Sequence, residues 1–143
     1  MGDAVMGWNK DWVRWYGGYK TGDLETTKWK RGDAKADRPY GTDDYFDDAI
    51  DKMRSTAYHE LGHQVHQLSR VRNRLDYRLR PVEQYMETKR YVRGKGAPTR
   101  YGDSNNKEWF AENFSMWAMR REDYCDPDFL TLIEKLLDGD PLD

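Results

Sequence analysis

Aliphatic side chains are scarce in this chain, and this scarcity limits the kind of core that it can build. Only 22 of its 143 residues are Leu, Ile, Val or Phe. So low a share is typical of disordered chains, but those chains also carry a high net charge, whereas the formal net charge here is −2. Aromatic residues make up 14% of the chain, and each large ring can bury about 150–250 Å². We therefore expect a small globular domain with an aromatic-rich core that needs an additional stabilising link.

Two classes of protein are excluded by simple features of the sequence. Cys125 is the only cysteine, so an internal disulfide is impossible. No apolar run approaches the ~18 residues needed to cross a bilayer, and residues 1–10 lack the basic start and apolar stretch of a signal peptide. We expect no membrane partner, and a location that is cytoplasmic, virion-associated or reached by non-classical export. The sequence does not indicate an oligomeric state.

The order of predicted elements indicates an α+β chain that is mostly helical. Within residues 1–40 we expect an aromatic-rich helix near the N-terminus and then a strand or hairpin over 21–32. Residues 41–143 are expected to form the main domain. It begins with a long helix from about Tyr45, capped by Thr42 or Asp43 and long enough for a break to be considered. Its predicted core-facing stripe contains the apolar residues Phe46, Ile50, Met53, Ala57, Leu61, Val65 and Leu68.

Three further segments follow this helix. Residues 82–91 are expected to form a short helix or strand. A helix capped by Ser104 or Asn105 is expected to run to about Arg121, with Phe110, Phe114 and Trp117 on its packing face. A last helix is expected to begin at Asp126-Pro127, as N-cap and first residue, and to end at Gly139.

The three histidines of the chain lie within eight residues, and two of them form the pattern H-E-x-x-H. On a helix, His59 and His63 lie one turn apart on one side, where two nitrogens can reach a single zinc ion. Glu60 lies beside them as a candidate base. The helical wheel places both histidines opposite the Ala57/Leu61 stripe, so we expect a packed back and a polar front. A solvated helix face with aligned histidines is the alternative.

A third ligand has to come from elsewhere in the chain. The metzincin extension requires Gly at 66 and His at 69, but the sequence has His66 and Ser69. His66 itself is expected to be a surface residue or to support the site rather than to ligate. Two glutamates, Glu108 and Glu112, share one face of a later helix. The alternative is structural: Glu108 forms a capping box with Asn105, and Glu112 is a solvated residue. These residues alone leave both interpretations open.

The residues around these positions resemble the catalytic core of the anthrax lethal-factor-like zinc peptidases, which are gluzincins related to the Pro-Pro endopeptidases. The resemblance rests on His-Glu-Leu-Gly-His at 59–63 and on Tyr-Gly-x-x-Asn-x-x-Glu-x-Phe-Ala-Glu at 101–112. It implies a zincin-like core with an active-site helix, a second Glu-bearing helix and a small β-sheet or hairpin. It also implies that Glu108 is the third zinc ligand, that Glu112 supports the site from behind, and that Tyr101 assists the transition state.

These assignments predict a zinc-dependent endopeptidase. Zinc on His59, His63 and Glu108 would keep one position open for water and lower the pKa of that water. Glu60 would accept the proton and pass it to the leaving amine, while Tyr101 would donate to the oxyanion. The predicted partner is a protein or peptide, which would be acidic if the basic block from Arg70 to Arg100 borders the cleft.

Two other functions are compatible with the sequence. In the first, the protein is a non-catalytic structural or interaction module, for example a phage structural component, in which zinc only holds the fold. In the second, the Arg70–Arg80 run binds nucleic acid. Since no nucleic-acid-binding motif accompanies that run, we favour its pairing with the acidic blocks at 33–51 and 122–143 within the fold.

Overall fold

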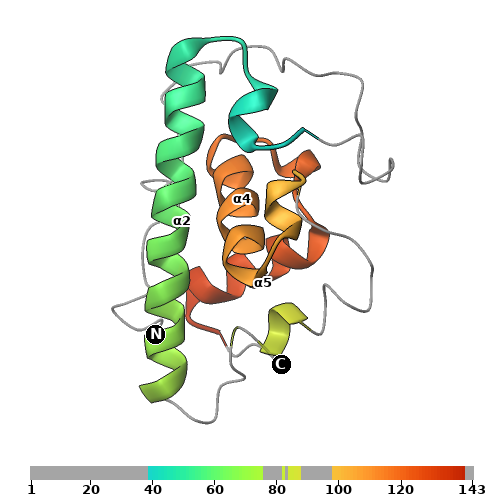
Figure 1. Ribbon diagram of the computed structural model, residues 1–143. Helices are drawn as coiled ribbons and strands as arrows, with labels where there is room; N and C mark the ends of the chain where they lie inside the picture. The colour runs from blue at the N-terminus through green and yellow to red at the C-terminus, as the bar shows by residue number, and fades with distance from the viewer. Residues whose placement is uncertain (1–38, 76–81, 83, 88–97, 141–143) are drawn as a thin grey trace.

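The computed structural model describes residues 39–75, 82, 84–87 and 98–140. Its main helices are α2 (Ala49–Leu75), α4 (Asn106–Ala118) and α5 (Pro127–Asp138) (Figure 1). Three 3-10 turns precede or separate them: η2 (Thr42–Tyr45), η3 (Tyr101–Asp103) and η4 (Glu122–Tyr124). Residues 82 and 84–87 are also helical.

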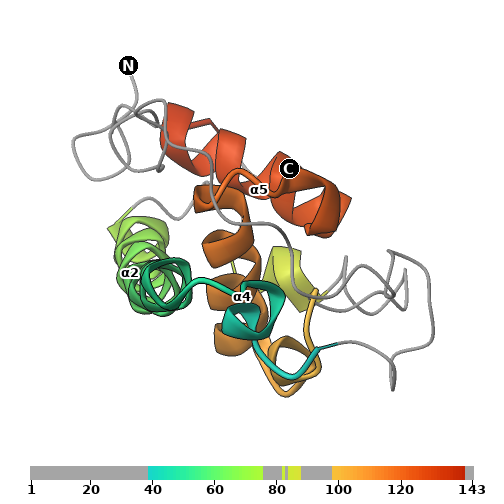
Figure 2. The ribbon, with the colours of Figure 1, turned by 90° about the horizontal axis from the view of Figure 1, so that it is seen from above.

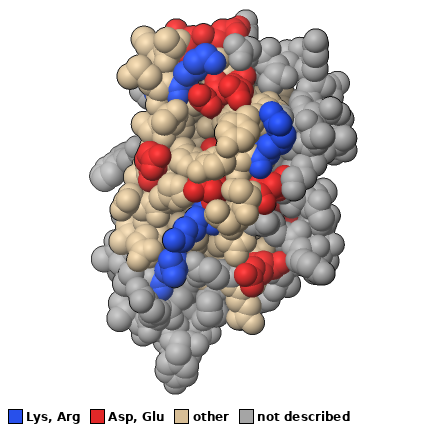
Figure 3. Space-filling model, viewed as in Figure 1, with Lys and Arg blue, Asp and Glu red and all other residues tan. Residues whose placement is uncertain are grey.

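The expectation of a mostly helical fold is confirmed for the part of the chain that is described, which contains no β-strand. The N-terminal helix and the hairpin expected at 21–32 lie outside the described residues, as does most of the Arg70–Arg100 block. Figure 3 shows basic and acidic side chains interspersed over one described face. No helix among the described residues combines the length and apolar character needed to span a membrane.

Helix α4 is the centre of the fold. It contacts α2, α5 and all three 3-10 turns, and every residue from Trp109 to Ala118 is buried. Figure 2 shows α4 with α2 on one side of it and α5 crossing on another. The core around α4 is built from rings: Phe129 of α5 meets Phe110 edge-on at 5.2 Å and Trp109 at 5.8 Å between ring centroids. The expectation of an aromatic-rich core is confirmed.

The start of α2 differs from the prediction. The helix begins at Ala49, where the Asp48 side chain accepts a hydrogen bond from the Asp51 amide at 3.3 Å. Thr42 and Asp43, the predicted caps, lie instead in η2, where the Asp44 side chain accepts from the Gly41 amide at 3.2 Å. From Ala49 the helix continues for 27 residues without the break that was considered, a length of about 40 Å at 1.5 Å per residue.

The buried face of α2 is also not the predicted one. Ile50 and Met53 are 54% and 71% exposed, and Ala57 is exposed as well. Leu61 and Leu68 pack only partly against the core. The face that α2 turns toward the protein is mainly small and polar, and it consists of Asp51, Ser55, His59, Gly62, Val65, His66 and Ser69. The predicted packed back and polar front were wrong, because the histidine side of α2 is the side that packs on α4.

A small residue makes this close packing possible. A Cβ atom built on Gly62 would lie 3.0 Å from the Ala111 Cα atom and 3.0 Å from the Phe114 Cβ atom. Nearby, the Ser115 hydroxyl donates to the Ser55 carbonyl oxygen at 2.6 Å. Later residues of α2 therefore meet earlier residues of α4: Ser55 pairs with Ser115, and Gly62 with Ala111. The two helices are antiparallel. Gly62 therefore sets how near the two ligand-bearing helices can approach.

The ends of α4 and α5 were predicted with different success. Asn105 caps α4 as expected, with its side chain accepting from the Glu108 amide at 3.0 Å. Asp126 caps α5, and Gly139 ends it in the left-handed conformation with φ 78°, as predicted. Helix α4, however, ends at Ala118 and not near Arg121, because Arg120 adopts φ 64° and the Arg121 amide donates back to the Met116 carbonyl oxygen at 2.8 Å.

We predict that Gly62→Ala destabilises the protein even though alanine favours helix. The gain in helix propensity is about 1 kcal/mol, and overpacking against backbone that cannot yield costs about 1–3 kcal/mol. Urea unfolding should show a lower midpoint for Gly62→Ala. The control is Gln64→Ala on the exposed side of the same helix, which should be neutral or slightly stabilising. A Gly62→Ala protein at least as stable as the wild type would contradict the close approach described here.

Candidate metal centre

Three side chains from two helices converge at one point. His59 and His63 come from α2 and Glu108 from the first turn of α4. The Nε2 atoms of the two histidines are 3.1 Å apart. The Glu108 Oε1 atom lies 3.0 Å from Nε2 of His59 and 3.2 Å from Nε2 of His63. These residues form a group that could hold a metal ion.

The triangle of ligand atoms fits a small cation. Ligands at about 2.0–2.1 Å from a tetrahedral ion lie about 3.3 Å from one another, close to the 3.0–3.2 Å separations seen here. The Glu108 Oε1 atom is buried, yet it has no hydrogen-bond donor of acceptable geometry within the described residues. A buried oxygen without a donor is costly, and a cation at the centre of the triangle would satisfy it.

His59 is oriented from behind by Glu112. The Glu112 Oε2 atom lies 2.7 Å from Nδ1 of His59, and Glu112 is only 2% exposed. An ionised carboxylate can only accept a hydrogen bond, so Nδ1 must carry the proton. This tautomer leaves the Nε2 lone pair directed at the Glu108 oxygen and at His63, as metal ligation requires. The structure thus places Glu112 behind His59 and not in solvent.

The electrostatic surroundings of His59 favour positive charge. Burial disfavours the charged imidazole and by itself would lower its pKa. The hydrogen bond with Glu112 and the negative charges of Glu112, Glu108 and Glu60 act in the opposite direction, and together they raise the pKa above its ordinary value near 6.5. A proton and a metal ion therefore compete for the same negatively charged site.

Tyr101 lies beside the triad on the turn η3. Its ring centroid is 5.9 Å from that of His59 and 5.7 Å from that of Tyr40. The Tyr101 amide donates to the Tyr40 carbonyl oxygen at 2.9 Å, which ties the turn to the segment before η2. Partial burial of the phenol, and then the charge of Glu108, raise the pKa of Tyr101 above 10.0. The phenol therefore stays protonated at neutral pH and can donate a hydrogen bond.

The other sequence candidates occupy different environments. Glu60 is exposed on α2, and its charge contributes to the raised pKa of His59. His66 is only 3% exposed and stacks on Phe110 with ring centroids 4.9 Å apart, so it is a core residue. His66 is not part of the triad, in line with the prediction; of the two places predicted for it, at the surface or in support of the site, the surface was wrong.

Sequence reasoning missed one polar residue of this centre. Thr99 is fully buried, and its hydroxyl lies 2.6 Å from the Glu112 Oε1 atom. A threonine in a loop between two glycines and a tyrosine carries no spacing signal. Only the folded chain brings Thr99 to a carboxylate 13 residues away.

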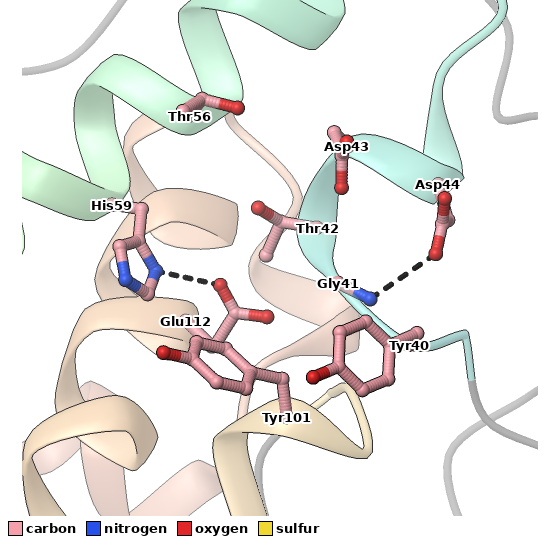
Figure 4. A pocket seen from close by; sticks show the side chains of 9 residues that line it. All are labelled: Tyr40, Gly41, Thr42, Asp43, Asp44, Thr56, His59, Tyr101 and Glu112. Atoms are coloured by element: carbon pink, nitrogen blue, oxygen red, sulfur yellow. Dashed lines mark hydrogen bonds and ion pairs between the residues drawn. The ribbon is translucent and has the colours of Figure 1, made fainter.

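A cavity of about 300 Å³ opens to solvent beside His59. Figure 4 shows it between α2, the segment around η2 and the turn that carries Tyr101. Two tyrosine rings, those of Tyr40 and Tyr101, stand on one side of it, while Asp43 and Asp44 lie on another. Of the triad, His59 alone lines this cavity, so a molecule bound in it would lie beside His59.

Comparison of the chain with protein-family models, with curated proteins and with solved structures gave no match.

We predict that the purified protein binds about one metal ion per chain. His63→Ala and Glu108→Ala should each lose most of it, since each removes one of three ligands. Glu134→Ala, on α5 away from the centre, is the matched control and should retain the metal. Elemental analysis by mass spectrometry measures the content. Full metal content in Glu108→Ala would show that this carboxylate is not a ligand.

Metal removal should also lower stability. An ion that binds only the folded state stabilises it by about 4 kcal/mol at 1,000 times its Kd. Calorimetry with and without a strong chelator should therefore give a clearly lower Tm in chelator, and restored zinc should reverse the change. The same Tm in both conditions would contradict a metal that joins α2 to α4.

Proposed function

We propose that this protein is a zinc-dependent endopeptidase in which His59, His63 and Glu108 hold the metal. The observation that carries the proposal is the convergence of these three ligand atoms within 4.8 Å of one another. Two histidines and one glutamate are the ligand set of catalytic zinc sites that keep a fourth position open. Iron enzymes also use two histidines and a carboxylate, but the Glu60 that follows His59 supports a hydrolytic site.

The chemistry divides between the metal and the protein. Bound zinc supplies Lewis acidity, which polarises a carbonyl oxygen and makes water more acidic. Glu60 is the general base: its exposed carboxylate accepts a proton from the attacking water and then gives it to the leaving amine. Tyr101 donates a hydrogen bond to the oxygen on which negative charge develops. A tyrosine phenol is protonated at neutral pH, which is the state that this role requires.

A peptide is the substrate class that best suits the open cavity. The cavity of about 300 Å³ beside His59 has room for a side chain of an extended chain. Its wall includes His59 and Tyr101, so a chain bound in it would lie beside one residue of the triad and the phenol. The resemblance of residues 59–63 and 101–112 to lethal-factor-like peptidases supports the same substrate class.

We predict that Glu60→Gln abolishes peptide cleavage while zinc and fold are retained. The exchange keeps the size of the side chain and removes its basicity, and loss of a positioned base costs about 10²–10⁴-fold. Cleavage is followed by mass spectrometry on a peptide library, with Glu134→Gln as the matched control. If the wild type retains zinc and cuts no peptide of the library, the proposal fails and the metal has a structural role.

We predict that Tyr101→Phe lowers kcat by about 10²–10³-fold, the cost of one oxyanion donor, with zinc affinity close to that of the wild type. The matched control is Tyr124→Phe, on the turn η4. An unchanged kcat in Tyr101→Phe would show that the phenol takes no part in catalysis. A parallel loss of zinc would show that it acts on metal binding instead.

A further inference from the structure

Thr99 has both of its hydrogen-bonding directions fixed by its partners. Its Oγ1 atom lies 2.6 Å from the Glu112 Oε1 atom and 3.0 Å from the Gly102 amide nitrogen. A carboxylate only accepts and a backbone amide only donates. The hydroxyl of Thr99 therefore donates to Glu112 and accepts from Gly102, so this side chain is locked between the two.

Glu112 extends this connection to the metal centre. Its second oxygen accepts from Nδ1 of His59 at 2.7 Å. A chain of three hydrogen bonds thus joins Gly102, Thr99, Glu112 and His59, and all four residues are buried. Buried hydrogen bonds of this kind are costly to break singly, because each break leaves a partner unsatisfied. Gly102 directly follows Tyr101 in the turn η3.

We propose that Thr99 is a positioning residue that couples the turn carrying Tyr101 to the ligand His59. Through Glu112 it holds the imidazole in the orientation and tautomer needed for ligation. Through the Gly102 amide it holds the turn, and with it the Tyr101 ring, at a set place beside the triad. The expected effect on turnover rests on the proposed function, but the effects on zinc affinity and on the turn do not.

Thr99→Val tests this coupling because valine has the same shape and no hydroxyl. It leaves the Gly102 amide and one Glu112 oxygen without their partner. Loss of a group that orients a metal ligand typically weakens metal affinity about 10–100-fold. Thr99→Ser keeps the hydroxyl and should restore the wild-type behaviour. The control is Thr131→Val: Thr131 is exposed on α5, outside the candidate centre, and its hydroxyl donates to the Pro127 carbonyl oxygen at 3.4 Å.

Three measurements separate positioning from simple packing. Zinc affinity is measured by competition with a chelator. The exchange rate of the Gly102 amide proton is measured by NMR, and kcat and KM are measured on a peptide that the wild type cleaves. For Thr99→Val we expect weaker zinc binding by about 10-fold or more, faster Gly102 exchange, and a lower kcat with KM nearly unchanged. Thr99→Ser and Thr131→Val should match the wild type in all three.

Two outcomes overturn the proposal. In the first, Thr99→Val binds zinc and protects the Gly102 amide as the wild type does. In the second, Thr99→Ser is as impaired as Thr99→Val although it keeps the hydroxyl, which would mean that the packing of the whole side chain and not its hydrogen bonds accounts for the loss. If the wild type cuts no peptide, the proposed function fails, while the zinc and exchange measurements still decide the role of Thr99.

A test on the wild type alone covers the case in which Thr99→Val does not fold. Zinc fixes His59, and through Glu112 and Thr99 it should slow exchange of the Gly102 amide. The Cys125 amide, which donates to the Glu122 carbonyl oxygen in the turn η4, is the control and should slow less. Equal slowing at both amides would mean that zinc acts only on global stability, and the coupling would be refuted.

Discussion

The close contact between α2 and α4 is the constraint on which the candidate centre depends. Two residues of the candidate triad lie on one helix and the third on the other, so the distances within the triad are set by how far apart the helix axes lie. At Gly62 a hydrogen stands where any other residue would place a carbon 3.0 Å from the backbone of Ala111. The glycine inside the H-E-x-x-H pattern is therefore a packing residue, and it allows Glu108 to reach both histidines.

The contact surface of α2 is unusual for a helix that packs on a hydrophobic core. It is lined by serines, histidines and a glycine, while Ile50 and Met53 face solvent. Polar groups can occupy such a surface only if they are hydrogen-bonded. Ser55 supplies its carbonyl to Ser115, and His59 supplies its Nδ1 proton to Glu112. Most of the buried aliphatic side chains that the structure describes lie elsewhere, on α5, namely Leu132, Ile133, Leu136 and Leu137.

This arrangement explains which predictions from the sequence succeeded. The α5 helix was predicted from end to end, because Asp126, Pro127 and Gly139 act on their own local backbone. Local chemistry likewise placed Asn105 as a cap. The end of α4 was missed because Arg120 takes a left-handed conformation usually reserved for glycine. The buried face of α2 was missed because periodicity was traced through large apolar residues, and here small residues mark the interface.

The sequence by itself determined that His59 and His63 lie together, since residues four apart on a helix share one side. It also offered Glu108 and Glu112 as candidates on one helix face, and the resemblance of the 101–112 segment to a peptidase family added Tyr101 to them. Only the tertiary structure decided that Glu108 completes the triad, that Glu112 is buried behind His59, and that Thr99 joins both to the turn of Tyr101. Contacts within a helix follow from its pitch, whereas contacts between helices depend on packing at Gly62, which no spacing along the chain encodes.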